Sequence, residues 1–274
     1  MVPGLRWGIR ASPEKGFNIL TYLIDTFMKR TSSWLIALVV VFGSLQACKN
    51  KDVDKVDTTL ITITNPPVEK VLTADEQAAL TPDMVVQSLK EGNRRFVTND
   101  ITARNHTALV RSASAGQFPK AVILSCLDSR IPVEDVFDKG IGDLFVGRVA
   151  GNFVNGDLLG SMEFGCKVSG AKLILVLGHE SCGAIKAAID DVQLGNITAM
   201  LANIKPAVVQ SQDFAGDKTS RNDSFVELVT KNNVLNTIET IKARSAILKE
   251  MSDQGKIKIV GAYYDLHTGE VNFL

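Results

Sequence analysis

Beyond residue 80, the chain alternates between two patterns of apolar and polar residues. Short segments rich in apolar residues predict buried strands at 121–125, 143–146, 172–177 and 256–260. Segments with apolar residues at helical spacing lie between them and predict helices at 133–137, 158–168, 182–190 and, with a break near 213–223, at 198–249. Such alternation is typical of an α/β domain with a mostly parallel central sheet and helices on both faces.

Both ends of this domain carry further signals. Thr81-Pro82-Asp83 is a strong helix start, with Thr as N-cap and Pro at the first helical position. This helix, over 81–96, and a second one at 106–113 form an N-terminal helical arm. The residues at 262–273 predict a hairpin that turns at Thr268-Gly269.

The first 76 residues have a different character. Met28-Lys29-Arg30 precedes a short apolar run, 34–42, and the layout is that of an export signal. The run is short for a membrane span, which needs about 20 residues. We predict an over-extended start at 1–27 with Met28 as the true first residue, a signal peptide at 28–47, a flexible tether at 48–76 and the folded domain at 77–274.

The signal ends in a sequence that resembles the lipobox of bacterial lipoproteins, Leu45-Gln46-Ala47-Cys48, although Gln46 is larger than the residue usual there. The resemblance implies cleavage before Cys48 and a lipid on its thiol. The protein would then be periplasmic and tethered to a bacterial membrane only through this lipid. A plain signal peptide or an uncleaved anchor are the alternatives.

Charge and composition narrow the function classes. Thirty Lys and Arg residues balance thirty Asp and Glu residues, so no basic surplus suggests a nucleic-acid partner. The chain has four cysteines. If Cys48 carries lipid, three remain, and this odd number favours metal coordination over a disulfide framework. Cys166 lies in an apolar helical pattern and is expected in the core.

The remaining residues that could bind a metal directly follow two predicted strands in the sequence. Cys126 and Asp128 follow the first, and His179 and Cys182 follow the third. The carboxyl ends of parallel strands are where sites form in open sheets. Two thiolates, an imidazole and a carboxylate suit a tetrahedral zinc ion. Arg130 is placed to bind the Asp128 carboxylate, which favours an exchangeable, catalytic site over a closed structural one.

Several sequence blocks resemble the β-class carbonic anhydrases over roughly residues 82–274. They are Cys126-x-Asp128-Ser129-Arg130, His179-x-x-Cys182-Gly183, Gln117-x-Pro119, the block at 142–152 that ends in Ala150-Gly151-Asn152, and Tyr264-Asp265-x-x-Thr268-Gly269. The resemblance implies zinc-dependent, reversible hydration of carbon dioxide to bicarbonate.

The resemblance also implies roles for single residues. Cys126, His179 and Cys182 would be permanent zinc ligands. Asp128 would alternate between the metal and Arg130. Gln117 and the backbone N–H of Gly183 would bind carbon dioxide or bicarbonate. The family also implies a homodimer or a multiple of dimers, in which Gln117 serves the neighbouring subunit.

Three residues depart from the family pattern or fit it only in part. Leu127 stands where Ser or Ala is frequent. Ile123 replaces the Trp of an inhibitory bicarbonate pocket found in some bacterial relatives, so that pocket is not expected. Arg148 matches another residue of that pocket, and we expect it to form an ion pair instead.

Two alternative functions remain open at this stage. The same zinc site hydrolyses carbon disulfide or carbonyl sulfide in some relatives. A non-catalytic zinc-binding lipoprotein is the other alternative, although such a protein needs neither Asp128 nor Arg130.

Overall fold

The computed structural model describes residues 70–274. The predictions for the start at Met28, the signal peptide, the lipidated Cys48 and most of the tether lie outside these residues. Within 70–274, no helix combines the length and the apolar character that crossing a bilayer requires.

The centre of the fold is a five-stranded sheet with the order β2-β1-β3-β4-β5. Its strands are β1 (Ala121–Ser125), β2 (Leu144–Arg148), β3 (Leu173–His179), β4 (Lys258–Tyr264) and β5 (Val271–Phe273). The first four are parallel to their neighbours, and β5 returns antiparallel to β4 after a turn. The α/β class with a mostly parallel sheet is therefore confirmed.

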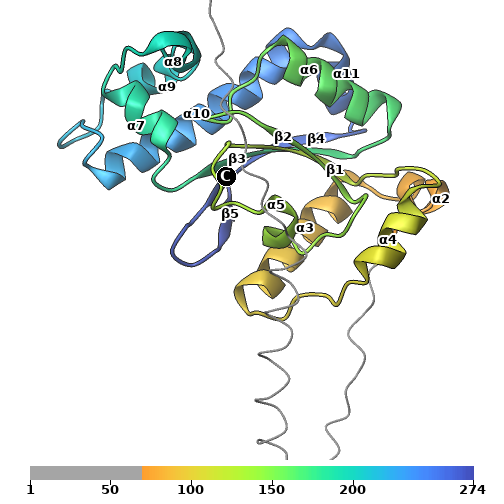
Figure 1. Cartoon of the computed structure of the whole chain (residues 1–274). Helices are drawn as coiled ribbons and strands as arrows, with labels where there is room; N and C mark the ends of the chain where they lie inside the picture. The colour runs from red at the N-terminus through yellow and green to blue at the C-terminus, as the bar shows by residue number, and fades with distance from the viewer. Residues whose placement is uncertain (1–69) are drawn as a thin grey trace, which may run out of the picture. The chain divides into compact units, whose positions relative to one another are not determined.

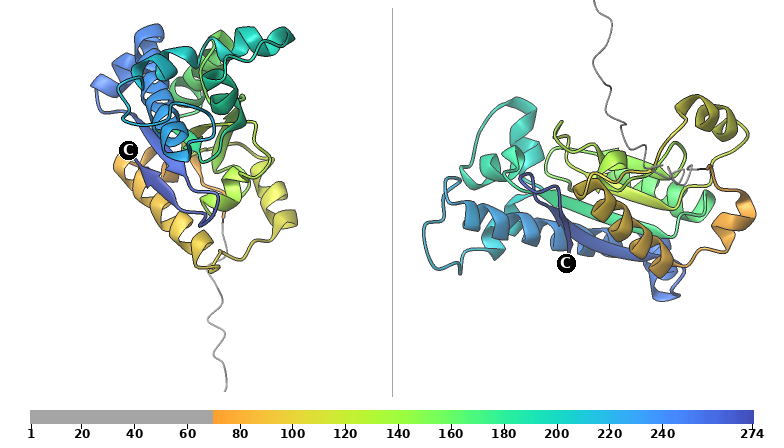
Figure 2. Two further views of the ribbon diagram at one scale, coloured as in Figure 1. Left: turned by 90° about the vertical axis from the view of Figure 1, so that its left-hand side faces the viewer. Right: turned by 90° about the horizontal axis from the view of Figure 1, so that it is seen from below.

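Helices cover both faces of this sheet (Figure 1). On one face lie α3 (Pro82–Val97) and the short α5 (Val133–Val136). On the other lie α6 (Gly156–Glu163), its π-helical extension η1 (Phe164–Val168), α10 (Asp223–Arg244) and α11 (Ala246–Asp253). Figure 2 shows the same layers from two further sides. The remaining helices are α2 (Ala74–Ala78), α4 (His106–Ala113), α7 (Gly183–Ile189), α8 (Gly195–Leu201) and α9 (Lys205–Gln210).

The strand pattern explains the two layers. All residues of β1 and β3 are buried, because both faces of these central strands are covered. Side chains alternate between the faces, so Val122 and Leu124 pack with α6 and α10, whereas Ala121 and Ile123 pack with α3 and α5. A third apolar cluster joins α7, α8 and α9 to the beginning of α10.

One helix, α2, is absent from the predicted elements, and several helices and strands end at other residues than predicted. Helix α2 includes residues 74–76, so the predicted tether is wrong for its last three residues. Thr73 and Glu76 form a capping box there, in which each side chain accepts a hydrogen bond from the backbone N–H of the other residue. Helix α2 is also attached to the sheet region, because the buried Gln77 amide donates to the carbonyls of Pro119 and Ser169. Strand β2 continues to Arg148, two residues beyond its predicted end.

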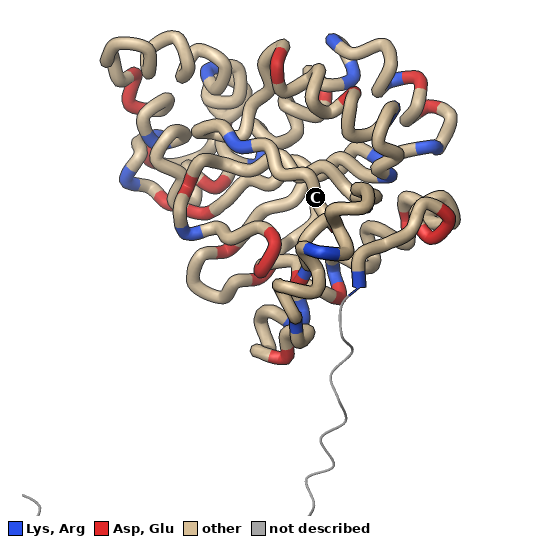
Figure 3. Tube along the Cα trace, turned by 45° about the vertical axis from the view of Figure 1, so that its right-hand side comes forward, with Lys and Arg blue, Asp and Glu red and all other residues tan. Residues whose placement is uncertain are grey.

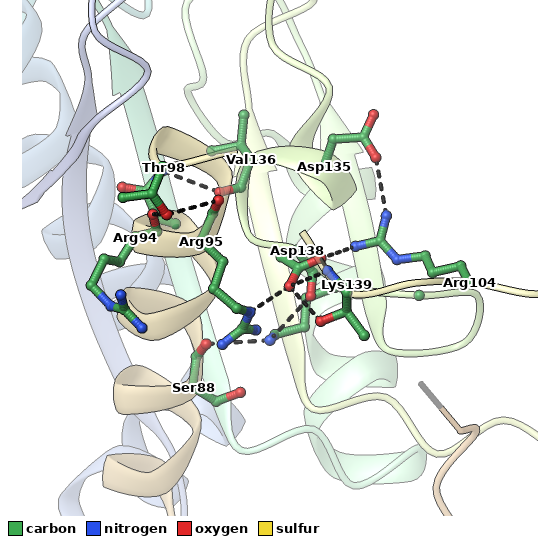
Figure 4. A network of polar contacts seen from close by, with 12 residues as sticks. Ser88, Arg94, Arg95, Thr98, Arg104, Asp135, Val136, Asp138 and Lys139 are labelled. Carbon is green, nitrogen blue, oxygen red and sulfur yellow. Dashed lines mark hydrogen bonds and ion pairs between the residues drawn. The ribbon is translucent and has the colours of Figure 1, made fainter. Parts of the chain in front are cut away.

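A buried carboxylate joins the helical arm to the sheet domain (Figure 4). Asp138 follows α5, and its side chain accepts hydrogen bonds from Arg95 of α3, from Arg104 and from Thr102. Charged groups elsewhere lie mixed along the trace, as Figure 3 shows. Since α5 directly follows the loop after β1, the Asp138 contacts fix the position of that loop's far end.

Candidate metal centre and active site

Three potential metal ligands meet at the carboxyl edge of the sheet. Cys126 follows β1 directly, His179 is the last residue of β3, and Cys182 is the N-cap of α7. All three are buried, and their ligand atoms lie within 4.8 Å of one another. The two sulfurs are 3.9 Å apart. Because β1 and β3 are adjacent in the sheet, the structure brings Cys126 together with His179 and Cys182, which lie 53 and 56 positions later in the chain.

The backbone after β3 turns so that both of its ligands face the same point. Ser181 has a φ of 50°, a left-handed conformation that reverses the chain between His179 and Cys182. The His179 Nδ1 lies 2.8 Å from the carbonyl oxygen of Glu180. A carbonyl only accepts, so Nδ1 carries the proton and Nε2 presents its lone pair. This Nε2 is buried and has no hydrogen-bond partner among the described residues.

The two thiols add an electrostatic reason for a cation. A hydrogen bond from Cys182 lowers the pKa of Cys126 to about 4, and the backbone N–H of Gly151 also donates to the Cys126 sulfur, at 3.3 Å. The pKa of Cys182 is raised, because its proton is held in that hydrogen bond and because it is buried. Protein groups alone thus stabilise one negative charge, whereas a divalent cation would stabilise two thiolates. With the free Nε2, these donors fit zinc.

Asp128 lies beside this cluster but outside it. Its carboxylate accepts two hydrogen bonds from the Arg130 guanidinium, at 2.9 and 2.7 Å, and one from the Arg130 backbone N–H at 2.9 Å. Its Oδ2 is 3.9 Å from His179 Nε2. The Arg130 hydrogen bonds are the main reason why the pKa of Asp128 falls to about 2. Asp128 therefore stays charged and paired at neutral pH. A metal held by Cys126, His179 and Cys182 would keep one position for water or substrate.

The family of the chain follows from comparison with known proteins. Residues 121–271 match the family model described as "Carbonic anhydrase". Carbonic anhydrase 2 of Mycobacterium tuberculosis strain H37Rv is 36% identical over 189 residues, which cover 67% of this chain and 88% of the relative. The chain belongs to the β-class carbonic anhydrases.

Other relatives agree with this assignment. A carbonic anhydrase of Synechococcus elongatus is 30% identical over 68% of this chain and 70% of its own length. Among solved structures, the Coccomyxa β-carbonic anhydrase in complex with acetazolamide matches with a TM-score of 0.54 and 25% identity, over 67% of this chain and 83% of that chain. A tetrameric β-carbonic anhydrase of Sordaria macrospora has the same fold, with a TM-score of 0.55, 20% identity and coverage of 61% and 86%.

The two predicted substrate residues of this β-carbonic anhydrase lie in different places. Gly183 is the first residue of α7, next to Cys182, and a side chain added there would meet open space. Its N–H belongs to the first helical turn, where N–H groups have no partner inside the helix. Gln117 is exposed and precedes β1, at the amino edge of the sheet. The length of β1 alone puts roughly 15 Å between Gln117 and Cys126, so the structure does not bring Gln117 to the site of its own chain.

Other residues around the site differ from their predicted roles or were missed. Arg148 forms no ion pair with the site; its guanidinium donates to backbone carbonyls of the loop after β1, so the ion-pair prediction was wrong. Asn233 of α10 donates to the Gly151 carbonyl and thereby fixes the N–H that reaches Cys126. The only sequence signal for this contact is that Gly151 belongs to the block at 142–152 that resembles the family. Leu127, between Cys126 and Asp128, is 67% exposed.

The ligand set predicts a selective loss of metal. Cys182→Ser should remove zinc, since the variant lacks one of two thiolates, whereas Cys166→Ala should keep it because Cys166 is buried in the separate cluster around α6. Metal analysis of both purified variants measures the difference. Near-stoichiometric zinc in Cys182→Ser would show that this sulfur is not a ligand.

Proposed function

We propose that the protein uses zinc to catalyse the reversible hydration of carbon dioxide to bicarbonate and a proton. The observation that carries this proposal is the combination of three buried ligands with a charged Asp128 held outside them by Arg130. A structural zinc site is closed by four protein ligands, whereas catalytic sites keep one position open. The donor set therefore argues against a non-catalytic zinc-binding lipoprotein.

Each neighbouring group has a task in this reaction. Zinc bound by Cys126, His179 and Cys182 would supply a positive charge and a water that ionises near pH 7. Asp128 accepts the remaining hydrogen of the attacking oxygen and orients its lone pair toward carbon. Arg130 keeps the Asp128 carboxylate in place and away from the metal. The Gly183 N–H, at the start of α7, donates to an oxygen of bicarbonate.

Hydrolysis of carbon disulfide or carbonyl sulfide is the second candidate reaction. Both molecules are linear and apolar like carbon dioxide, and the same oxygen nucleophile would attack their carbon. The exposed apolar side chain of Leu127 beside Cys126 is the observation that keeps this candidate open. Parallel assays with carbon dioxide and carbon disulfide distinguish the two reactions.

A direct assay of the zinc-loaded full chain tests the proposed reaction. We expect carbon dioxide hydration in a stopped-flow assay at neutral to mildly alkaline pH, and little or no turnover of carbon disulfide measured in parallel. Arg130→Ala should keep its zinc but lose activity roughly 10- to 100-fold, because Asp128 loses the partner that orients it.

An exposed arginine of α4 provides the matched control for this assay. Arg111→Ala removes the same type of side chain far along the helical arm and should retain wild-type activity. Zinc-loaded wild-type protein that fails to hydrate carbon dioxide would refute the proposed function. Full activity of Arg130→Ala would instead refute only the role given to Asp128.

We further infer that the working form is a homodimer or a multiple of dimers. The position of Gln117 supports this, because it lies at the opposite edge of the sheet from its own chain's ligands and can serve only another copy's site. The Sordaria macrospora relative is described as tetrameric. In this arrangement the Gln117 amide of one subunit donates to carbon dioxide or bicarbonate at the site of its neighbour.

Mixed dimers test this arrangement. Gln117→Ala and Cys182→Ser should each lower activity in homodimers, the first by losing the substrate contact and the second by losing zinc. When the two variants form a mixed dimer, activity should recover. The Gln117→Ala chain keeps an intact ligand set, and the Cys182→Ser chain supplies Gln117 to that site. No recovery in a mixed dimer isolated by two affinity tags would contradict the shared site.

The proposed location is the periplasm, with the protein attached to a membrane by a lipid on Cys48. The support is the order of charged, apolar and small residues at 28–47 ahead of this cysteine. The carbonic anhydrase domain itself would interact with the membrane only through that lipid.

Fractionation of bacterial cells tests the anchor. The wild-type protein should sediment with membranes and incorporate a labelled fatty acid, while Cys48→Ala should do neither; Cys166→Ala, matched in residue type, should behave as wild type. Mass spectrometry of the unprocessed precursor checks the start at Met28. A soluble, unlabelled wild-type protein would exclude lipidation, and peptides from residues 1–27 would exclude that start.

A further inference from the structure

Strand β2 ends in an arginine that contacts the loop carrying the active-site residues. The Arg148 guanidinium donates to three backbone carbonyls, those of Cys126 at 3.0 Å, Asp128 at 3.4 Å and Ile131 at 2.6 Å. Strand pairing explains how it reaches them. Parallel register places Arg148 beside Ser125, the residue before Cys126, so its side chain lies next to the point where the loop begins.

This loop has little support of its own. Residues 126–131 form neither helix nor strand. No backbone N–H within residues 70–274 donates to the three carbonyls that Arg148 binds. The loop nevertheless carries the Cys126 sulfur, the Asp128 carboxylate and the Arg130 fork. Burial of Cys126 and Ile131 fixes the two ends of the loop. The path of the backbone between these ends depends on Arg148, a side chain from the edge strand.

Arginine is suited to this task in a way that lysine is not. Its planar guanidinium offers five N–H donors in a fixed fork, so one side chain serves several acceptors at once. A lysine ammonium is a single point on a flexible stem and reaches the carbonyls only one or two at a time. The three acceptors follow one another along the loop, so binding them together fixes the path of the backbone past Asp128.

We propose that Arg148 is a positioning residue for the hydration reaction: it holds the loop so that Asp128 stays on Arg130 and away from the metal. The inference rests on the proposed function for its catalytic consequence, but its structural part stands alone. Arg148 acts on the reaction only through the backbone of the loop. Its loss therefore lowers the turnover of bound substrate and has little effect on substrate binding. The metal ligands stay in place, because Cys126 is buried and its sulfur also accepts a hydrogen bond from the Gly151 N–H.

Amide hydrogen exchange and steady-state kinetics test the proposal on the full chain. In Arg148→Gln, peptides spanning 127–132 should exchange about 10-fold faster than in the wild type, while peptides of β1 and β3 should be unchanged. Zinc content should stay near stoichiometric. The kcat should fall roughly 10- to 100-fold, the range seen when groups that orient metal-site residues are removed, with KM changed by less than about 2-fold.

Two further variants keep the outcome decisive. Arg148→Lys should give intermediate loop exchange and intermediate kcat, and it replaces Arg148→Gln as the test if the latter fails to fold. Arg94→Gln, an exposed arginine of α3, should match the wild type in every measurement.

Specific results would overturn the proposal. Wild-type loop exchange in both Arg148 variants would do so, as would wild-type kcat with a loosened loop. A drop confined to zinc content or to KM would assign Arg148 another role. If wild-type protein does not hydrate carbon dioxide, the proposed function fails, whereas the exchange data still decide whether Arg148 holds the loop.

Discussion

The parallel pairing of β1 with β3 is the constraint on which the site depends. Ser125 lies opposite Leu177, so both strands end at the same edge of the sheet, where Cys126 follows β1 and His179 is the last residue of β3. A shift of one residue would turn either ligand to the other face. Complete burial of both strands prevents that shift, because each face packs against its own layer of helices. The hydrophobic core thereby sets the geometry of a polar, metal-binding site.

The site itself is arranged around unbalanced charge. A nearby positive charge stabilises each group of the site: the two adjacent thiols, the lone pair of His179 Nε2 and the Asp128 carboxylate. Arg130 supplies the positive charge next to Asp128, and a metal would supply it next to the thiols and His179. The pairing of Asp128 with Arg130 matters for the chemistry, because a carboxylate that is already paired with arginine competes less strongly for zinc. The Asp128 carboxylate nevertheless stays beside the ligand cluster, with its Oδ2 3.9 Å from His179 Nε2.

Contacts from β2, α10 and α5 hold the segments that carry the candidate metal ligands. Arg148 of β2 binds the loop after β1, Asn233 of α10 binds the turn whose N–H reaches Cys126, and Asp138 ties α5 to the helical arm. These contacts use backbone carbonyls or buried carboxylates as acceptors. They join segments up to 82 residues apart, as between Gly151 and Asn233.

The sequence alone determined the alternation of strands and helices, the grouping of Cys126, His179 and Cys182, and the pairing partner of Asp128. These depend on local patterns: apolar runs, helix caps and ligand residues placed directly behind strands. Only the tertiary structure decided that Arg148 binds carbonyls instead of a carboxylate and that α2 is part of the domain. Each of these depends on which backbone groups other segments leave unpaired, and no local pattern of residues encodes that.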